Sequence, residues 1–166
     1  MSAEIQVLVM MGVAGAGKTT IGRLVAEGLD WPFVEGDDLH PPANVARMAA
    51  GQPLTDADRA PWLDAVAAQI DTWITAGQGG VITCSALKRA YRDRLRRPQV
   101  RFVFLAAARG EIGRRLEHRR GHFMPASLAD SQFAALETPE ADEGALVLGE
   151  GTPEALARAL VEAVNG

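Results

Sequence analysis

The stretch Gly12-Val13-Ala14-Gly15-Ala16-Gly17-Lys18-Thr19 decides the fold of this chain. A glycine, four variable positions and then Gly-Lys-Thr form the pattern of a loop that binds phosphate groups. Apolar residues 5–11 precede it and read as a buried strand, and residues 20–29 follow with apolar side chains at helical spacing. This order of strand, glycine-rich turn and helix separates a phosphate-binding loop from an ordinary turn. The chain is therefore predicted to bind a nucleoside triphosphate.

The residues of this loop have separate tasks in holding a triphosphate. Its glycines allow successive backbone N–H groups to point into one concavity, and the helix N-terminus behind them adds a partial positive charge. Lys18 can reach the β- and γ-phosphates, and the Thr19 hydroxyl is placed to bind Mg²⁺. The nucleotide-binding residues predicted here are Gly12, Ala14, Gly15, Ala16, Gly17, Lys18, Thr19 and Thr20.

Size and composition predict one soluble domain spanning residues 1–166. Of its residues, 48% are hydrophobic and 23% are charged, which is ordinary for a globular protein. Residues 1–4 lack the basic start of a secretion signal, and no apolar run is long enough to span a bilayer. Cys84 is the single cysteine, so an intrachain disulfide is excluded and a cytoplasmic location is expected.

Charge is unevenly distributed along the chain. The net charge is -4, yet residues 88–122 hold most of the 17 Lys and Arg. Such a cluster suits nucleic acid, a membrane surface or small anions. An acidic chain with few aromatic residues argues against broad nucleic-acid binding. Because a phosphate loop is already present, we expect small anions as the partners of this cluster, and no nucleic acid or membrane.

Apolar strand patterns alternate with helical patterns along the chain. Strands are predicted at 5–11, 31–35, 79–84, 100–105 and 146–148. Helices are predicted at 20–29, 43–50, 58–76, 88–97, 109–119, from 127 and from 152. Thr55 is expected to cap the helix at 58–76, whose tryptophans are expected in the core. The alternation predicts an α/β fold of three layers, in which helices cover both faces of a five-stranded parallel sheet.

Ligands of such sheets bind beyond the carboxyl ends of the strands. The phosphate loop follows the first predicted strand, residues 37–40 follow the second and residues 85–88 follow the third. Since the carboxyl ends of parallel strands lie at one edge, these three segments are expected to form one site.

The segment after the second strand carries two candidates for handling the phosphoryl acceptor. An aspartate at position 37 can accept a proton from a substrate hydroxyl or hold a water on Mg²⁺. Its alternative role is to cap the following helix. His40 can donate a hydrogen bond to an acidic or polyhydroxyl substrate, and the alternative is a solvated loop histidine.

Four basic residues outside the phosphate loop are candidates for gripping an anionic substrate. Arg47 and Arg59 flank a Gly-Pro loop, where one arginine can hold a carboxylate through two charge-assisted bonds. Surface ion pairs are the alternative for both. Lys88 and Arg92 lie one helical turn apart, so both can converge on one anion.

A basic segment with a glycine break, about 115–137, has the composition of a lid that closes over phosphates. Arg115 and Arg119 are the candidates for contacting the nucleotide and the transferred phosphoryl group, and His122 for contacting the substrate. The alternative is a basic helix exposed to solvent. A GTPase switch is disfavoured, because no Asn-Lys-x-Asp motif occurs.

Several segments together resemble the gluconokinase family of small P-loop kinases. The resemblance covers nearly the whole chain. It is carried by the phosphate loop together with Gly36-Asp37-Asp38-Leu39-His40-Pro41, residues 47–54, residues 56–63, Cys84-Ser85-Ala86-Leu87-Lys88-Arg89-Ala90-Tyr91-Arg92-Asp93 and Gly121-His122-Phe123. Very many NTPases share the phosphate loop, whereas the joint presence of the other segments is far more specific.

That resemblance implies a nucleoside-monophosphate-kinase-like fold with a helical lid, and a homodimer. It implies ATP-dependent phosphorylation of D-gluconate at its 6-hydroxyl with Mg²⁺, as part of carbohydrate metabolism in the pentose phosphate pathway. Lys18, Asp37 and Arg119 are then the predicted catalytic residues. The predicted substrate-binding residues are Asp37, His40, Arg47, Arg59, Lys88, Arg92 and His122. A related kinase for shikimate or a nucleoside is the alternative enzyme.

Overall fold

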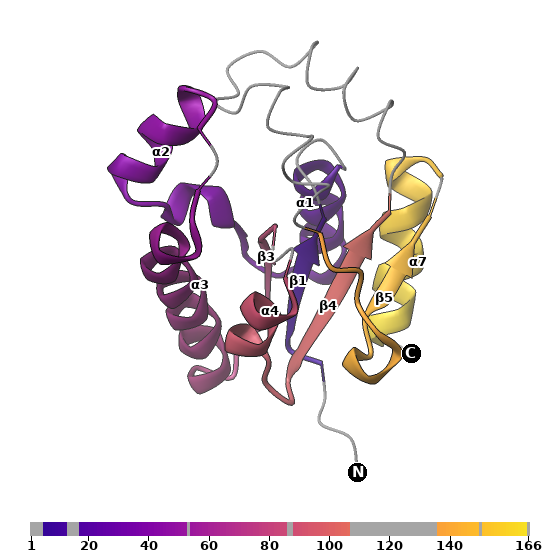
Figure 1. Cartoon of the computed structure of the whole chain (residues 1–166). Coiled ribbons are helices and arrows are strands. Elements are labelled where there is room, and N and C mark those ends of the chain that lie inside the picture. The colour runs from indigo at the N-terminus through magenta and orange to yellow at the C-terminus, as the bar shows by residue number, and fades with distance from the viewer. Residues whose placement is uncertain are drawn as a thin grey trace.

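A five-stranded parallel sheet forms the centre of the computed structural model, which describes residues 5–12, 17–52, 54–85, 88–106, 136–149 and 151–165 (Figure 1). The strands are β1 (Val7–Met11), β2 (Phe33–Glu35), β3 (Gly80–Thr83), β4 (Val100–Leu105) and β5 (Leu146–Leu148). Their order across the sheet is β2-β3-β1-β4-β5. This architecture confirms the predicted α/β class.

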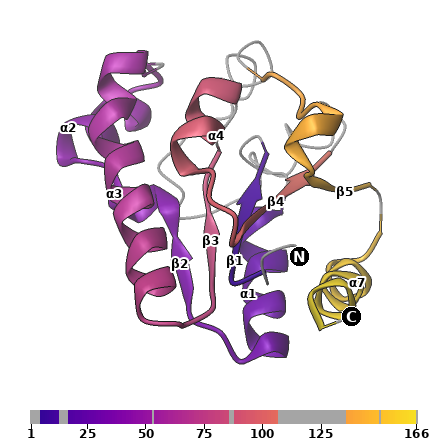
Figure 2. The same cartoon turned by 90° about the horizontal axis from the view of Figure 1, so that it is seen from below.

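Helices cover the two faces of the sheet. Helices α1 (Lys18–Leu29) and α7 (Pro153–Asn165) pack on one face, and α3 (Asp56–Thr75) and α4 (Arg89–Leu95) on the other. Figure 2, seen from below, places α1 and α4 on opposite sides of the strands. The layers follow from sequence, because β1 is buried on both faces and side chains alternate along it.

Alternation along β1 divides the core into two halves. Leu8 and Met10 pack with residues of α1 and α7, whereas Val7, Val9 and Met11 pack with residues of α3 and α4. On the second face the tryptophans of α3, at positions 62 and 73, are buried as predicted. Large aromatic surfaces thus fix α3 against the sheet.

Local signals placed the helix starts well. The Thr55 hydroxyl accepts from the Asp58 N–H, and Asp58 accepts from the Thr55 N–H, so a capping box opens α3. The Thr152 hydroxyl caps α7 by accepting from the Ala155 N–H, without a reciprocal bond. Helix α3 begins two residues before the predicted position, because Asp56 already lies inside the capped turn.

The remaining described elements are short. They are η1 (Gly36–Leu39), α2 (Pro42–Ala49) and η2 (Ala141–Glu143). No helix in the described residues is both long and apolar enough to cross a membrane. The predicted helices at 109–119 and from 127, and most of the predicted lid, lie outside the described residues.

Candidate active site

The described parts of the three predicted site segments lie at the carboxyl edge of the sheet. Strand β3 pairs with β1 on one side and with β2 on the other, all in parallel. The segments that follow these strands are the phosphate loop after β1, η1 after β2 and the residues leading to Lys88 after β3. Neighbouring strands therefore bring the start of the phosphate loop at Gly12 to the same edge of the sheet as Lys88, which lies more than 70 positions later in the chain.

The phosphate loop turns on glycines in backbone conformations that other residues rarely adopt. Gly12 has φ 146° and Gly17, the N-cap of α1, has φ 100°. The Lys18 ammonium donates to the Gly12 carbonyl oxygen at 2.8 Å, so its side chain folds back along the loop. A helix N-terminus that follows such glycines favours the binding of phosphate groups. The predicted contacts of Ala14, Gly15 and Ala16 lie outside the described residues.

A carboxylate on β2 connects the start of α1 to the strand ends. The Thr19 hydroxyl donates to Glu35 Oε2 at 2.7 Å, and the Thr83 hydroxyl donates to Glu35 Oε1 at 2.5 Å. The Gly36 N–H in turn donates to the Thr83 hydroxyl oxygen at 3.0 Å. A Cβ on Gly36 would lie 1.8 Å from the Thr83 carbonyl oxygen, so only glycine permits this close approach.

The donor atoms near Thr19 suit Mg²⁺ bound with a nucleotide. Among the described residues no group of three His, Cys, Asp or Glu forms a ready metal cage. Mg²⁺ often needs none, because it keeps several waters and takes phosphate oxygens together with one or two protein ligands. The Thr19 proton is committed to Glu35, so the oxygen lone pairs can face a metal. The chemistry of these residues fits the ion.

Asp37 and His40, the predicted acceptor groups, lie in and directly after η1. Asp37 is half-buried whereas Asp38 is exposed. The N-cap of α2 is Pro41, which leaves Asp37 outside the capping position that was its alternative role. His40 is buried and its ring stacks on Trp62, with centroids 4.3 Å apart and an interplanar angle of 11°. It is therefore not a solvated loop histidine.

Burial determines the charge of His40. Removal from water, assisted by the positive charge of Arg59, lowers the pKa of His40 from 6.5 to about 4. The ring is consequently neutral at physiological pH. Trp62, which supports the ring, is itself fixed, because its indole N–H donates to the Gly36 carbonyl oxygen at 2.8 Å.

Arg59 and Lys88 lie around the N-terminal turn of α3, together with two further side chains. The Arg59 guanidinium donates to the Tyr91 hydroxyl at 3.2 Å, and the Tyr91 hydroxyl donates to the Asp56 carboxylate. The Lys88 ammonium donates to the same carboxylate at 3.1 Å. Hydrogen bonds from Tyr91 and Lys88 lower the pKa of Asp56, and the bond to Asp56 raises the pKa of Lys88.

Arg47 joins this region through Asp58. Its guanidinium lies 3.5 Å from an Asp58 carboxylate oxygen, and its side chain is 50% exposed. An ion pair this exposed contributes little to stability, so it leaves the Arg47 side chain available to a ligand. Four predicted substrate residues, at positions 40, 47, 59 and 88, thus approach the start of α3.

Comparison with known proteins assigns the chain to a family. The family model described as shikimate kinase matches residues 14–144. The gluconokinase of Gluconobacter oxydans is 52% identical over 157 residues, covering 93% of this chain and 88% of that protein. The chain belongs to the gluconokinase family. It is accordingly a kinase.

Solved structures agree with this membership of the gluconokinase family. The crystal structure of a gluconokinase from Sinorhizobium meliloti is 38% identical, covers 96% of this chain and 95% of that chain, and gives a TM-score of 0.79. The crystal structure of an unliganded sugar kinase from Janibacter is 46% identical, covers 97% of this chain and 95% of that chain, and gives a TM-score of 0.91. The P-loop kinase fold of the gluconokinases is therefore the fold of this chain.

Arg92 has surroundings that its helical spacing from Lys88 did not suggest. Its side chain is 1% exposed, and its Nε and Nη2 donate to the two carboxylate oxygens of Glu143 at 2.6 and 3.1 Å. Lys88 contacts Asp56 of α3 instead. The two cations thus contact different carboxylates on different elements, and a substrate contact of Arg92 stays a prediction.

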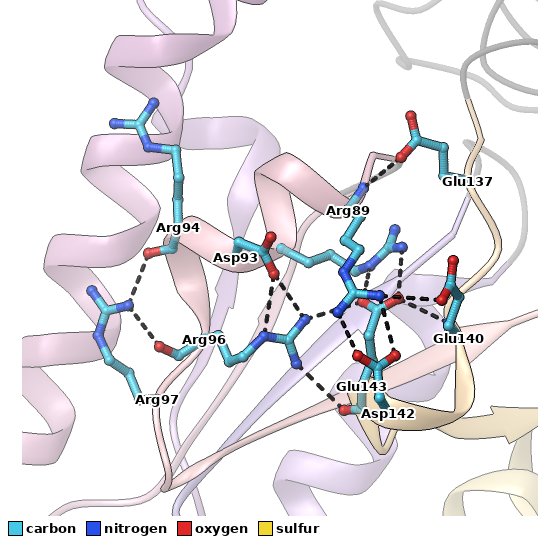
Figure 3. A network of polar contacts seen from close by, with 10 residues as sticks. Arg89, Asp93, Arg94, Arg96, Arg97, Glu137, Glu140, Asp142 and Glu143 are labelled. Carbon is cyan, nitrogen blue, oxygen red and sulfur yellow. Dashed lines mark hydrogen bonds and ion pairs between the residues drawn. The ribbon is translucent and has the colours of Figure 1, made fainter.

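Glu143 belongs to a larger polar network that joins α4 to the segment 137–143 (Figure 3). Arg96 Nη2 also donates to Glu143 at 3.1 Å, and the Arg89 guanidinium pairs with Asp142 at 2.6 Å. The Arg89 N–H donates to the Glu137 carboxylate at 3.1 Å. The hydrogen bonds from Arg92 lower the pKa of Glu143 to about 2. This network fixes the start of α4, where Lys88 is the N-cap residue.

Three predicted site residues, Arg115, Arg119 and His122, lie outside the described residues, so their roles stay predictions. Conversely, sequence reasoning missed Glu35 as a site residue. Its signal was available, because Glu35 is the last residue of a strand that leads directly into the Asp37 segment. An acidic residue at a strand end beside the phosphate loop is a candidate partner for a metal-binding hydroxyl.

Proposed function

We propose that this chain transfers the γ-phosphoryl group of ATP to the 6-hydroxyl of D-gluconate, giving 6-phospho-D-gluconate and ADP. Membership of the gluconokinase family supports this reaction. The observation that carries it is the link between the two halves of the site. Glu35 is hydrogen bonded to Thr19 of the phosphate loop, and Asp37 follows two residues later. An acceptor held by Asp37 would therefore lie next to the triphosphate.

In the proposed reaction, the 6-oxygen of gluconate forms a bond to the γ-phosphorus while the bond from that phosphorus to the bridging oxygen of ADP breaks. The hydroxyl proton passes to the Asp37 carboxylate. Lys18 and the backbone N–H groups at the start of α1 stabilise the negative charge on the phosphates. We assign Arg115 to the nucleotide and Arg119 to the moving phosphoryl group.

Mg²⁺ is the proposed cofactor, and Thr19 is the residue that would bind it. When bound, the ion would neutralise charge on the β- and γ-phosphate oxygens. Glu35 would hold the Thr19 hydroxyl in the orientation that turns its lone pairs outward, because it accepts the hydroxyl proton. Thr83 keeps Glu35 in place from the neighbouring strand.

The proposed acceptor site suits a small polyhydroxyl carboxylate. Lys88, Arg59 and Arg47 supply positive charge for the gluconate carboxylate, and His40 supplies a neutral hydrogen-bond donor for an oxygen of the sugar acid. We also assign His122 and Arg92 to this site as predictions from the family resemblance. Arg47 and Lys88 are already paired with carboxylates of α3, so a bound gluconate would share or replace those partners.

A homodimer and a cytoplasmic location complete the proposal. The family resemblance supports the dimer, and the single cysteine, which is buried, fits a reducing compartment. Light scattering of the purified protein across a range of concentrations measures the oligomeric state, and cell fractionation measures the location.

A coupled assay of ADP release tests the proposed reaction. The purified chain is given MgATP with gluconate, shikimate or a nucleoside as acceptor. We expect gluconate-dependent turnover, with rates on the other acceptors lower by at least about 100-fold. A site that bonds to a substrate carboxylate and hydroxyls rejects molecules that do not carry these groups at the same positions, because its buried polar groups would then have no partner. No turnover with gluconate would refute the proposal.

A further inference from the structure

Asn44, on α2, is a buried polar residue without a role in the reaction described so far. Its side chain is 4% exposed. Its amide nitrogen lies 2.8 Å from the Asp58 carbonyl oxygen and 3.2 Å from Nδ1 of His40. One side-chain nitrogen thus contacts the start of α3 and the proposed substrate-binding histidine.

These two contacts determine which ring nitrogen of His40 carries the proton. A backbone carbonyl oxygen only accepts, so the atom of Asn44 that faces Asp58 is the NH₂ group. Its second hydrogen then points to Nδ1 of His40, which must act as the acceptor. A neutral imidazole carries one proton, and that proton is consequently on Nε2.

The rest of the surroundings hold the ring in one orientation. Trp62 stacks on its face and is fixed by the bond to the Gly36 carbonyl oxygen, so the plane of the imidazole is set. Asn44 sets the rotation within that plane. The opposite tautomer would place an N–H of His40 against an N–H of Asn44, and one buried donor would lose its partner, which is unfavourable.

We propose that Asn44 is a positioning residue that keeps the proton of His40 on Nε2, so that His40 offers an N–H donor to an oxygen of the phosphoryl acceptor. This inference rests on the proposed function, because it takes the acceptor to be an oxygen-rich acid. The fixed tautomer contributes to specificity. An Nε2–H can bond to a carboxylate or hydroxyl oxygen, whereas an unprotonated Nε2 would repel a carboxylate.

Nitrogen-15 NMR of the whole wild-type protein tests the tautomer without any substitution. The chain has 3 histidines, and the signals of His40 are identified as those lost in the His40→Gln variant. We expect the Nε2–H pattern for His40 at neutral pH, with an unprotonated Nδ1. An Nδ1–H pattern, or a rapidly exchanging mixture of both tautomers, would overturn the proposal.

Asn44→Asp tests the consequence for substrate binding. A carboxylate at position 44 accepts from Nδ1 and draws the proton there, so the Nε2 donor is lost. We expect the KM for gluconate to rise by roughly tenfold, the value for one hydrogen bond to a charged group, with the KM for ATP within about twofold. The NMR pattern of His40 should change in the same variant.

Asn165→Asp makes the same chemical change at an exposed position at the end of α7. It should leave the NMR pattern of His40 and the KM for gluconate unchanged. A wild-type tautomer and a wild-type gluconate KM in Asn44→Asp would overturn the role of Asn44. If wild-type protein shows the Nε2–H pattern but no gluconate turnover, the substrate assignment fails while the control of His40 by Asn44 is supported.

Discussion

At the scale of single residues, two carboxylates near the end of β2 have different proposed tasks: Glu35 is the last residue of the strand and Asp37 lies in η1. Glu35 accepts hydrogen bonds from the hydroxyls of Thr19 and Thr83, so both of its carboxylate oxygens have partners. Asp37 lies two residues further along, half-buried in η1. This division suggests that one carboxylate orients the metal-binding hydroxyl while the other handles the acceptor proton. Each task predicts a different defect on substitution.

Asp37→Asn should lower turnover by about 10²–10⁴-fold, because an amide cannot take the proton of the 6-hydroxyl. Binding of ATP, measured by calorimetry, should stay within about twofold. Asp38→Asn is the matched control, since Asp38 is the exposed neighbour and should keep its activity. Near-normal turnover of the Asp37 variant would show that this carboxylate is structural.

Glu35→Gln should weaken Mg²⁺ binding, because an amide offers one acceptor oxygen where two hydroxyl donors now bond. We expect the Mg²⁺ concentration needed for half-maximal tight binding of ADP to rise by about tenfold or more. Calorimetry with and without Mg²⁺ measures this directly. Glu27→Gln, on the exposed part of α1, is the control. Equal Mg²⁺ dependence in both variants would contradict the assignment of Glu35.

At the scale of elements, the buried pair of Arg92 and Glu143 joins α4 to η2, while Lys88 at the start of α4 contacts α3. Helix α4 is short, with 7 residues, and has little helical stability of its own. Its position therefore depends on side-chain contacts at both ends. The network of Figure 3 supplies those on the side of segment 137–143.

Glu143→Gln should destabilise the protein by about 3–5 kcal/mol, because it removes the buried carboxylate that accepts two hydrogen bonds from the Arg92 guanidinium. Urea denaturation measures the loss. The exposed pair of Arg94 and Asp64 offers a matched control, and Asp64→Asn should cost less than about 1 kcal/mol. Equal losses in both variants would contradict a special role of the buried pair.

At the scale of the whole molecule, two groups on different parts of the fold make stability depend on pH in successive ranges. His40 lies on the α3 side of the acceptor site and is held neutral, with a pKa of about 4. Glu143 lies in η2, and its hydrogen bonds from Arg92 of α4 keep it charged, with a pKa of about 2. Both pKa values are below those of the unfolded chain, so both groups favour the folded state at neutral pH and lose this contribution on acidification.

Stability should be constant above pH 7 and should fall as the pH drops from 6.5 to 4, because the unfolded chain protonates His40 and the native chain does not. This loss is on the order of 3 kcal/mol by pH 4, because the pKa of His40 differs by about 2.5 units between the two states. A further loss follows between pH 4.5 and 2 as Glu143 titrates. Urea denaturation at pH 8 to 4 measures the first range. The His40→Gln variant should show a flatter curve there, and an unchanged slope would contradict this origin.

Sequence patterns predicted those parts of the molecule that depend on local rules. The phosphate loop, the strands at 100–105 and 146–148 and the cap at Thr55 follow from glycine conformation, apolar runs and side-chain hydrogen bonding within a few residues. The meeting of three loops at one edge also followed, because parallel strands with helical crossovers put their carboxyl ends together. This rule predicted Asp37 and His40 as candidate site residues.

The tertiary structure alone decided the partners of these residues. The order β2-β3-β1-β4-β5 brings Thr83 beside Glu35, and the position of α2 near the start of α3 lets Asn44 bond to His40 and Asp58. Arg92 lies one turn from Lys88, yet it faces Glu143, 51 positions later. Helical spacing tells which side chains share a face but not which element covers that face. Local patterns therefore predicted the candidate site of this chain, and long-range packing determined the partners of its side chains.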